Sequence, residues 1–122
     1  MERFSLKKRI KSFGHAFRGI GVFLKTTHNV WIQLIILVLV IVLGVYFNIT
    51  NTEWIAITFA AGLVIIAEAF NTAMEIHMNL TSPDLHPFAR DTKDVAAGAV
   101  LLSAIVAIIV GLIIFVPHFI KQ

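Results

Sequence analysis

Two glutamates, an asparagine and a threonine recur at helical spacing within an otherwise apolar stretch of the sequence. They stand at positions i, i+3, i+4 and i+7 of one segment: Glu68, Asn71, Thr72 and Glu75. This spacing places the four side chains on one stripe of a helix. A carboxylate at membrane depth costs about 2.5–3.5 kcal/mol, so two of them on one stripe call for a partner, a metal ion or a proton.

Polar groups on a membrane helix can also serve assembly, by forming hydrogen bonds between helices. For a single asparagine or threonine, that structural interpretation is preferred. Two carboxylates and an amide on one stripe favour a functional site, with Glu75 near the membrane boundary and Glu68 roughly 10 Å deeper. Glu68 is then a candidate general base.

The composition indicates which solvent surrounds these residues. Of 122 residues, 58% are hydrophobic and 14% charged, against roughly 45–50% and about 25% in soluble domains, and the mean hydropathy is +0.89. The chain has no cysteine, which excludes disulfides, thiolate metal sites and a cysteine nucleophile. We expect one all-α integral membrane domain over residues 1–122.

Three apolar stretches are long enough to cross a hydrocarbon core as helices, at residues 30–47, 54–78 and 95–116. The first has only Gln33 and Gly44 as interruptions, which is typical of a lipid-facing helix. Residues 1–29 are predicted to form an amphipathic interfacial helix and contain no cleavable signal pattern. Its apolar residues recur at spacings of four and three: Leu6, Ile10, Phe13, Phe17, Ile20 and Leu24.

The distribution of lysine and arginine predicts the orientation in the membrane. Seven of the ten precede the first span, residues 48–53 have none, and only Lys121 follows the third span. The remaining two, Arg90 and Lys93, lie in the predicted loop 79–94. The N-terminus and that loop are therefore expected to be cytoplasmic, and the C-terminus to lie outside the cytoplasm.

The end of this loop is a second candidate for chemistry. Asp91 is predicted to be the N-cap of the third helix, with Asp94 near capping-box spacing. Lys93 and Asp94 would then open that helix, where free N–H groups and the helix dipole favour an anion such as a phosphate. The alternative is structural: the two aspartates cap the helix and Lys93 extends to the lipid head groups.

A small residue at every fourth position of the third helix predicts close helix packing: Ala99, Ser103, Ala107 and Gly111. Three helices of this size can hardly enclose a nucleotide and a lipid, so we expect a homo-oligomer with sites between protomers. The sequence contains no phosphate-binding glycine loop, soluble-kinase signature, esterase elbow or zinc-binding H-E-x-x-H pair.

The segment E-A-F-N-T-A-M-E at 68–75, followed from Lys93 by K-D-V-A-A-G-A-V, resembles the signature of the prokaryotic diacylglycerol kinase family, which includes undecaprenol kinases. The resemblance covers nearly the whole chain. It implies a homotrimeric, multi-pass enzyme of the bacterial inner membrane that uses Mg²⁺ and ATP. Such an enzyme transfers the γ-phosphoryl group to a lipid alcohol, diacylglycerol or undecaprenol, among membrane lipids, with no nucleic-acid partner.

Carried onto this sequence, the resemblance implies that Glu68 is the base that takes the lipid hydroxyl proton and that Asn71 positions the phosphoryl group. Glu75 would bind the metal of the nucleotide. The nucleotide itself would contact a wider set of residues, drawn from the N-terminal helix, the second span and the loop: Lys8, His15, Glu75, Asp84, His86, Lys93 and Asp94.

The sequence departs from the family pattern at three positions, and each departure removes a charge. Thr27 stands in place of a metal-binding glutamate, Trp31 in place of an arginine and Asn79 in place of an aspartate. Thr27 could still ligate magnesium through its hydroxyl or a water, as a weaker ligand than a carboxylate.

Two other functional classes compete with the lipid kinase. A membrane-embedded glutamate in a small oligomer is also found in proton-coupled transporters, although a carrier does not need Lys93 and Asp94 at a cytoplasmic helix start. The second competing class is a non-catalytic relative that keeps only the fold. The presence of Thr27 in place of the family's metal-binding glutamate favours this class.

Overall fold

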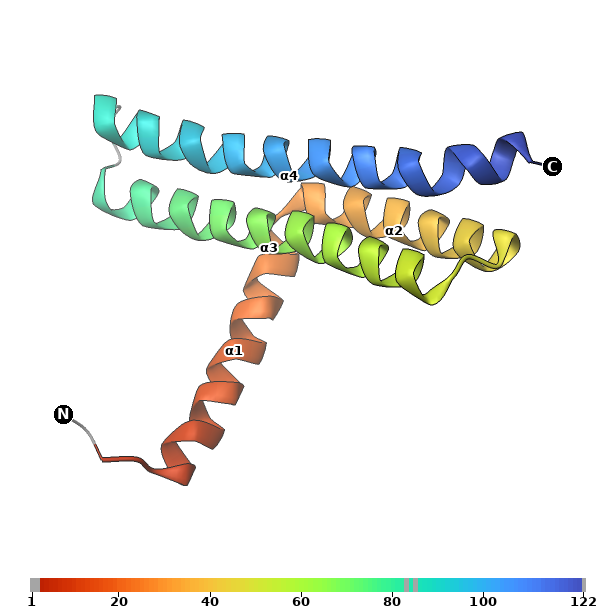
Figure 1. The fold of residues 1–122 in the computed structure, drawn as a ribbon. Helices are drawn as coiled ribbons and strands as arrows, with labels where there is room; N and C mark the ends of the chain where they lie inside the picture. The colour runs from red at the N-terminus through yellow and green to blue at the C-terminus, as the bar shows by residue number, and fades with distance from the viewer. Residues whose placement is uncertain (1–2, 83, 85, 122) are drawn as a thin grey trace.

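The computed structural model describes residues 3–82, 84 and 86–121, and most of these residues are helical. The helices are α1 (Leu6–Thr26), α2 (His28–Phe47), α3 (Asn51–Thr81) and α4 (Pro87–Ile120). Helices α2, α3 and α4 lie side by side, while α1 projects away from this bundle (Figure 1). Within the described part of the chain, α2, α3 and α4 are each long and apolar enough to cross a membrane. The predicted all-α membrane fold is confirmed.

A sharp elbow at Thr27 separates α1 from α2. The backbone of Thr27 is extended, with φ −113° and ψ 98°, and its N–H donates to the carbonyl of Phe23. On the far side of the elbow, Trp31 Nε1 donates to the Leu24 carbonyl over 2.8 Å. Helix α1 has no buried residue, and Phe13 and Phe17 are more than 60% exposed. This is the expected state of an amphipathic helix whose apolar face meets a membrane surface.

The connection between α2 and α3 is short and tightly packed. Asn48 ends α2 in the left-handed conformation at φ 52°, which an asparagine adopts more readily than most residues. Thr50 and Glu53 form a reciprocal capping box that begins α3. Gly44 permits the close approach of the two helices, because a Cβ there would lie 2.5 Å from the indole of Trp54.

The buried apolar core lies at this end of the bundle. It consists of Ile49, Ile57, Ile114 and Phe115. Beside it, the ring of His118 stacks on Phe47 with centroids 5.5 Å apart, and its Nε2 lies 3.3 Å from Glu53 Oε2. Most other large apolar side chains of the three long helices are exposed, so they are available to lipid or to other protomers.

The start of α4 differs from the prediction. The helix begins at Pro87, and His86 is its N-cap, with Nδ1 accepting from the Phe88 N–H over 3.1 Å. Proline is favourable at the first helical position because the missing N–H has no intrahelical acceptor there. The prediction of Asp91 as N-cap was therefore wrong, and the predicted loop 79–94 was too long, since α3 continues to Thr81.

Candidate functional site

Glu68 is the most buried ionisable side chain among the described residues, with 2% exposure. Its partner comes from α2, where Gln33 Nε2 donates to Glu68 Oε1 over 2.9 Å. The Oε1 atom of Gln33 is shielded from solvent and has no hydrogen-bond partner among the described atoms. Among the described residues, Glu68 is thus held by one neutral amide and forms no ion pair, and the unpartnered Oε1 of that amide lies nearby.

Thr72 lies one helical turn after Glu68 on α3. Its hydroxyl lies 2.6 Å from the hydroxyl of Thr27. Both residues are buried, and the contact joins the elbow between α1 and α2 to the polar stripe of α3. One hydroxyl donates and the other accepts in this contact, so each side chain has a hydrogen-bond partner. Thr27 was predicted as a metal ligand, and the structure places it in a hydrogen bond that fixes the elbow.

Asn71 and Glu75 form the remaining part of the stripe. Asn71 Nδ2 lies 3.5 Å from Glu75 Oε1, which is a long contact. Asn71 Oδ1 is shielded from solvent and has no partner among the described residues, whereas Glu75 is exposed. An unpartnered amide oxygen beside an exposed carboxylate is suited to a ligand that brings its own cation or donor.

Lys93 lies within the second turn of α4, so the prediction that Lys93 and Asp94 open this helix was wrong. The free N–H groups at the helix start therefore belong to earlier residues. Lys93 instead faces α3, where its Nζ donates to Asn79 Oδ1 over 2.6 Å. The lysine is half-buried beside the C-terminal part of α3, and Asp94 next to it is exposed.

The other predicted nucleotide contacts are scattered in this single chain. Lys8 and His15 lie on α1, which leads away from the bundle (Figure 1). Asp84 is exposed in the link between α3 and α4, and His86 is engaged as the N-cap of α4. The fold therefore brings Glu75 and Lys93 to the linked end of the α3–α4 pair, with Asn71 and Glu68 successively further from that end along α3, and leaves Lys8 and His15 on α1.

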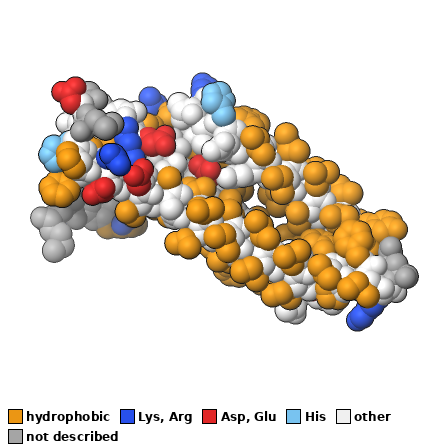
Figure 2. Space-filling model, turned by 90° about the horizontal axis from the view of Figure 1, so that it is seen from above, with side chains coloured by type: hydrophobic (Ala, Val, Ile, Leu, Met, Phe, Trp, Pro, Cys, Tyr) orange, Lys and Arg blue, Asp and Glu red, His pale blue; other side chains and the backbone are white. Residues whose placement is uncertain are grey.

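Most of the visible charged side chains gather over one end of the molecule, and hydrophobic side chains cover most of the remaining visible face, with one basic side chain at the opposite end (Figure 2). The link between α3 and α4 lies at this end of the bundle. Glu75 near the end of α3 and Lys93 near the start of α4 lie at the same end. Acidic and basic groups are interspersed there, which suits a ligand that carries both phosphates and a divalent cation.

The donor set at this end fits a magnesium ion that arrives with a nucleotide. No cluster of three or more histidine, aspartate or glutamate side chains within the described ranges is arranged to hold a metal. Magnesium usually keeps several waters and binds through one or two carboxylates together with substrate phosphates. Glu75 and the unpartnered Asn71 Oδ1 supply such a partial set.

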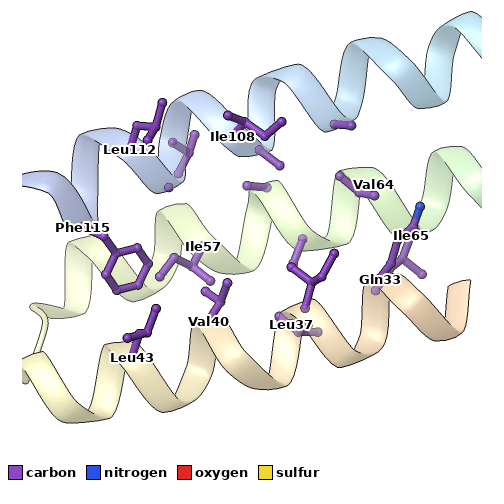
Figure 3. A pocket seen from close by; sticks show the side chains of 17 residues that line it. Gln33, Leu37, Val40, Leu43, Ile57, Val64, Ile65, Ile108, Leu112 and Phe115 are labelled. Atoms are coloured by element: carbon purple, nitrogen blue, oxygen red, sulfur yellow. The ribbon is translucent and has the colours of Figure 1, made fainter. Parts of the chain in front are cut away.

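An apolar groove of about 510 Å³ runs between α2, α3 and α4 (Figure 3). Gln33 and Ile65 lie at one end of it, and Leu43 and Phe115 lie towards the other. The lining is almost entirely aliphatic, with Gln33 as its polar member. Gln33 also donates to Glu68, so this one side chain links the groove to the buried carboxylate, which does not itself line the groove.

Sequence reasoning missed the contribution of Gln33. Helix α2 was predicted to face lipid, but Gln33 is half-buried and turned towards α3. The available signal was the presence of one amide in a span of otherwise aliphatic residues, since an amide in hydrocarbon needs a hydrogen-bonding partner.

The chain is similar to proteins of known activity over most of its length. A family model described as prokaryotic diacylglycerol kinase matches residues 14–115. An undecaprenol kinase of Bacillus subtilis (strain 168) is 36% identical over 115 residues, which are 94% of each chain. A diacylglycerol kinase of Synechocystis sp. is 36% identical over 107 residues, 87% of this chain and 61% of that relative. The chain belongs to the prokaryotic diacylglycerol kinase family, whose members are membrane lipid kinases.

Proposed function

We propose that this protein transfers the γ-phosphoryl group of ATP to the hydroxyl group of a membrane lipid alcohol. The observation that carries the proposal is the buried carboxylate of Glu68, which is hydrogen-bonded to Gln33 at one end of an apolar groove. A lipid alcohol has the same two parts, because a hydrocarbon chain would occupy the groove and its hydroxyl would meet the carboxylate. The named activities of the relatives make undecaprenol and diacylglycerol the first acceptors to test.

In the proposed reaction, Glu68 takes the proton as the acceptor oxygen attacks the γ-phosphorus of ATP. The O–H bond of the lipid and the bond from the β–γ bridging oxygen to the γ-phosphorus break. A new O–P bond forms, and ADP leaves with the electron pair of the broken P–O bond. Such transfers depend on positioning and charge neutralisation.

Glu75 and Asn71 would hold a magnesium ion of the nucleotide, which neutralises phosphate charge when it is bound. Lys93 is half-buried on the neighbouring helix, so it could exchange its contact with Asn79 for a phosphate oxygen. An ammonium group is a compact point charge that needs no special phosphate geometry.

A homotrimer is the proposed assembly. Within one chain, α1 projects away from the bundle, so Lys8 and His15 could contact the nucleotide of another protomer (Figure 1). The exposed apolar side chains along α2 and α4 also leave room for contacts between protomers. A site built at such an interface would be enclosed better than the open stripe of a single chain.

We infer that the N-terminus lies in the cytoplasm of a bacterial inner membrane and that the C-terminus lies outside. The charge asymmetry of the sequence supports this orientation, and it places the charged end with Glu75 where ATP is available. A reporter active only in the cytoplasm should be active when fused to the N-terminus and silent when fused after Gln122. The reverse result would overturn the orientation.

The function can be tested with the full-length protein purified in detergent and supplied with γ-labelled ATP and Mg²⁺. We expect label to appear in a lipid phosphate when undecaprenol or diacylglycerol is added. Label in water-soluble phosphate alone would indicate ATP hydrolysis. No transfer to any alcohol in a panel of membrane lipids would favour a non-catalytic relative that keeps only the fold.

A further inference from the structure

Gln33 has two properties that no part of the proposed reaction uses. Its Nε2 donates to Glu68, and its Oε1 is shielded from solvent without a partner. An ionised carboxylate only accepts hydrogen bonds, so the NH₂ group of the amide must face Glu68. The amide oxygen is therefore directed away from the carboxylate and stays unsatisfied while Glu68 is ionised.

We propose that Gln33 is a positioning residue that keeps Glu68 hydrogen-bonded before and after the base takes a proton. This inference rests on the proposed function, because it assigns a role within phosphoryl transfer. Before the reaction, the amide N–H holds one carboxylate oxygen and leaves the other directed to the acceptor hydroxyl. The amide thus fixes the orientation of a side chain that has no other hydrogen-bond partner among the described residues.

After the proton transfer, Glu68 carries an O–H group that needs an acceptor. The terminal torsion of a glutamine is broad and roughly two-fold, so the amide can turn over at low cost. The Oε1 atom of Gln33 then accepts the hydrogen bond from the protonated Glu68. One side chain thereby serves both charge states, which neither a purely apolar residue nor a lysine could do.

The position of Gln33 on the groove supports this role. Gln33 lines the groove at the end opposite Phe115 (Figure 3), so a lipid chain in the groove would bring its hydroxyl to the pair formed by Gln33 and Glu68. In an apolar surrounding, an unpaired polar group costs more than it does in water. The proton on Glu68 therefore needs this acceptor.

The test compares three purified full-length variants: Gln33→Met, Gln33→His and, as control, Ile35→Met. Methionine matches glutamine in length but cannot form the hydrogen bonds, whereas histidine keeps one donor and one acceptor. Ile35 lies on the same helix and is 64% exposed. The measurements are kcat and KM with undecaprenol and with a diacylglycerol in separate assays, the Kd of Mg·ATP, and thermal unfolding in one detergent.

We expect Gln33→Met to lower kcat by about 10- to 100-fold, the range for a hydrogen bond to a charged group. The KM for lipid and the Kd of Mg·ATP should stay unchanged, and Gln33→His should be more active than Gln33→Met. A role in packing alone predicts the opposite order, because methionine fits the space of glutamine better than an imidazole does.

Wild-type kcat in Gln33→Met, or a Gln33→Met variant that is more active than Gln33→His, would overturn the proposal. If Gln33→Met does not unfold cooperatively, inactivity of a well-folded Gln33→His would overturn it instead. If the wild-type protein phosphorylates no lipid alcohol in the panel, the proposed function fails and the positioning role fails with it. The activity of the wild type therefore distinguishes the two failures.

Discussion

Replacing Glu68 with glutamine is expected to lower lipid phosphorylation by about 100- to 10,000-fold, the usual contribution of a general base. Glutamine keeps the size of the side chain and can still bond to Gln33, but it cannot take the hydroxyl proton. The affinity for Mg·ATP should stay close to that of the wild type, because Glu68 lies deeper than the charged end of the molecule. Turnover and ATP affinity are measured on the same purified sample.

Glu53→Gln is the matched control for this substitution. It makes the same chemical change on the same helix, at the end that carries the core and the contact with His118. We expect Glu53→Gln to retain activity, with at most a small loss of thermal stability. Near-normal turnover in Glu68→Gln would exclude the general-base role, and the polar stripe would then be interpreted as a means of helix assembly.

Replacing Glu75 with glutamine should give a different defect, which is the second large expected effect. The carboxylate is exposed beside Asn71, where it would ligate the magnesium of the nucleotide. We expect the Kd of Mg·ATP to rise by about 10- to 100-fold, because an interaction with a charged group is lost. Isothermal titration at several magnesium concentrations measures this change.

The two glutamate variants are informative together. Saturating Mg·ATP should restore most of the turnover of Glu75→Gln but none of that of Glu68→Gln, because only the first defect lies in binding. An unchanged Kd in Glu75→Gln would contradict the metal-binding role. The magnesium would then have to be held by other residues, including residues of another protomer.

The spans and the polar stripe could be predicted because both are local properties of the sequence. Hydropathy over about 20 residues locates a spanning helix, and a spacing of three and four places Glu68, Asn71 and Glu75 on one face. The beginning of α4 was missed for a local reason as well. Pro87 was interpreted as part of an irregular loop, although proline is equally typical of the first turn of a helix.

The partners of the site residues could not be predicted, because they depend on how the helices are rotated against each other. Helix α2 is almost uniformly apolar, so its sequence indicates that the amide of Gln33 needs a polar partner but does not reveal that this partner is Glu68. The hydrogen-bond partners of the three residues that depart from the family pattern could not be predicted either. Thr27, Trp31 and Asn79 each lack a charge, and each takes part in a hydrogen bond that only the folded chain defines.

We expect the elbow at Thr27 to couple the candidate site to bilayer thickness. Helix α1 is suited to lie in the head-group layer, and its end is attached to α3 through Thr27 and Thr72. With α1 in that layer, the head-group plane would set how far Glu68 sits below the membrane surface. In a bilayer of different thickness, the long helices would adjust by tilting. Catalytic rate should consequently vary with acyl-chain length in reconstituted vesicles, even when the acceptor lipid stays the same.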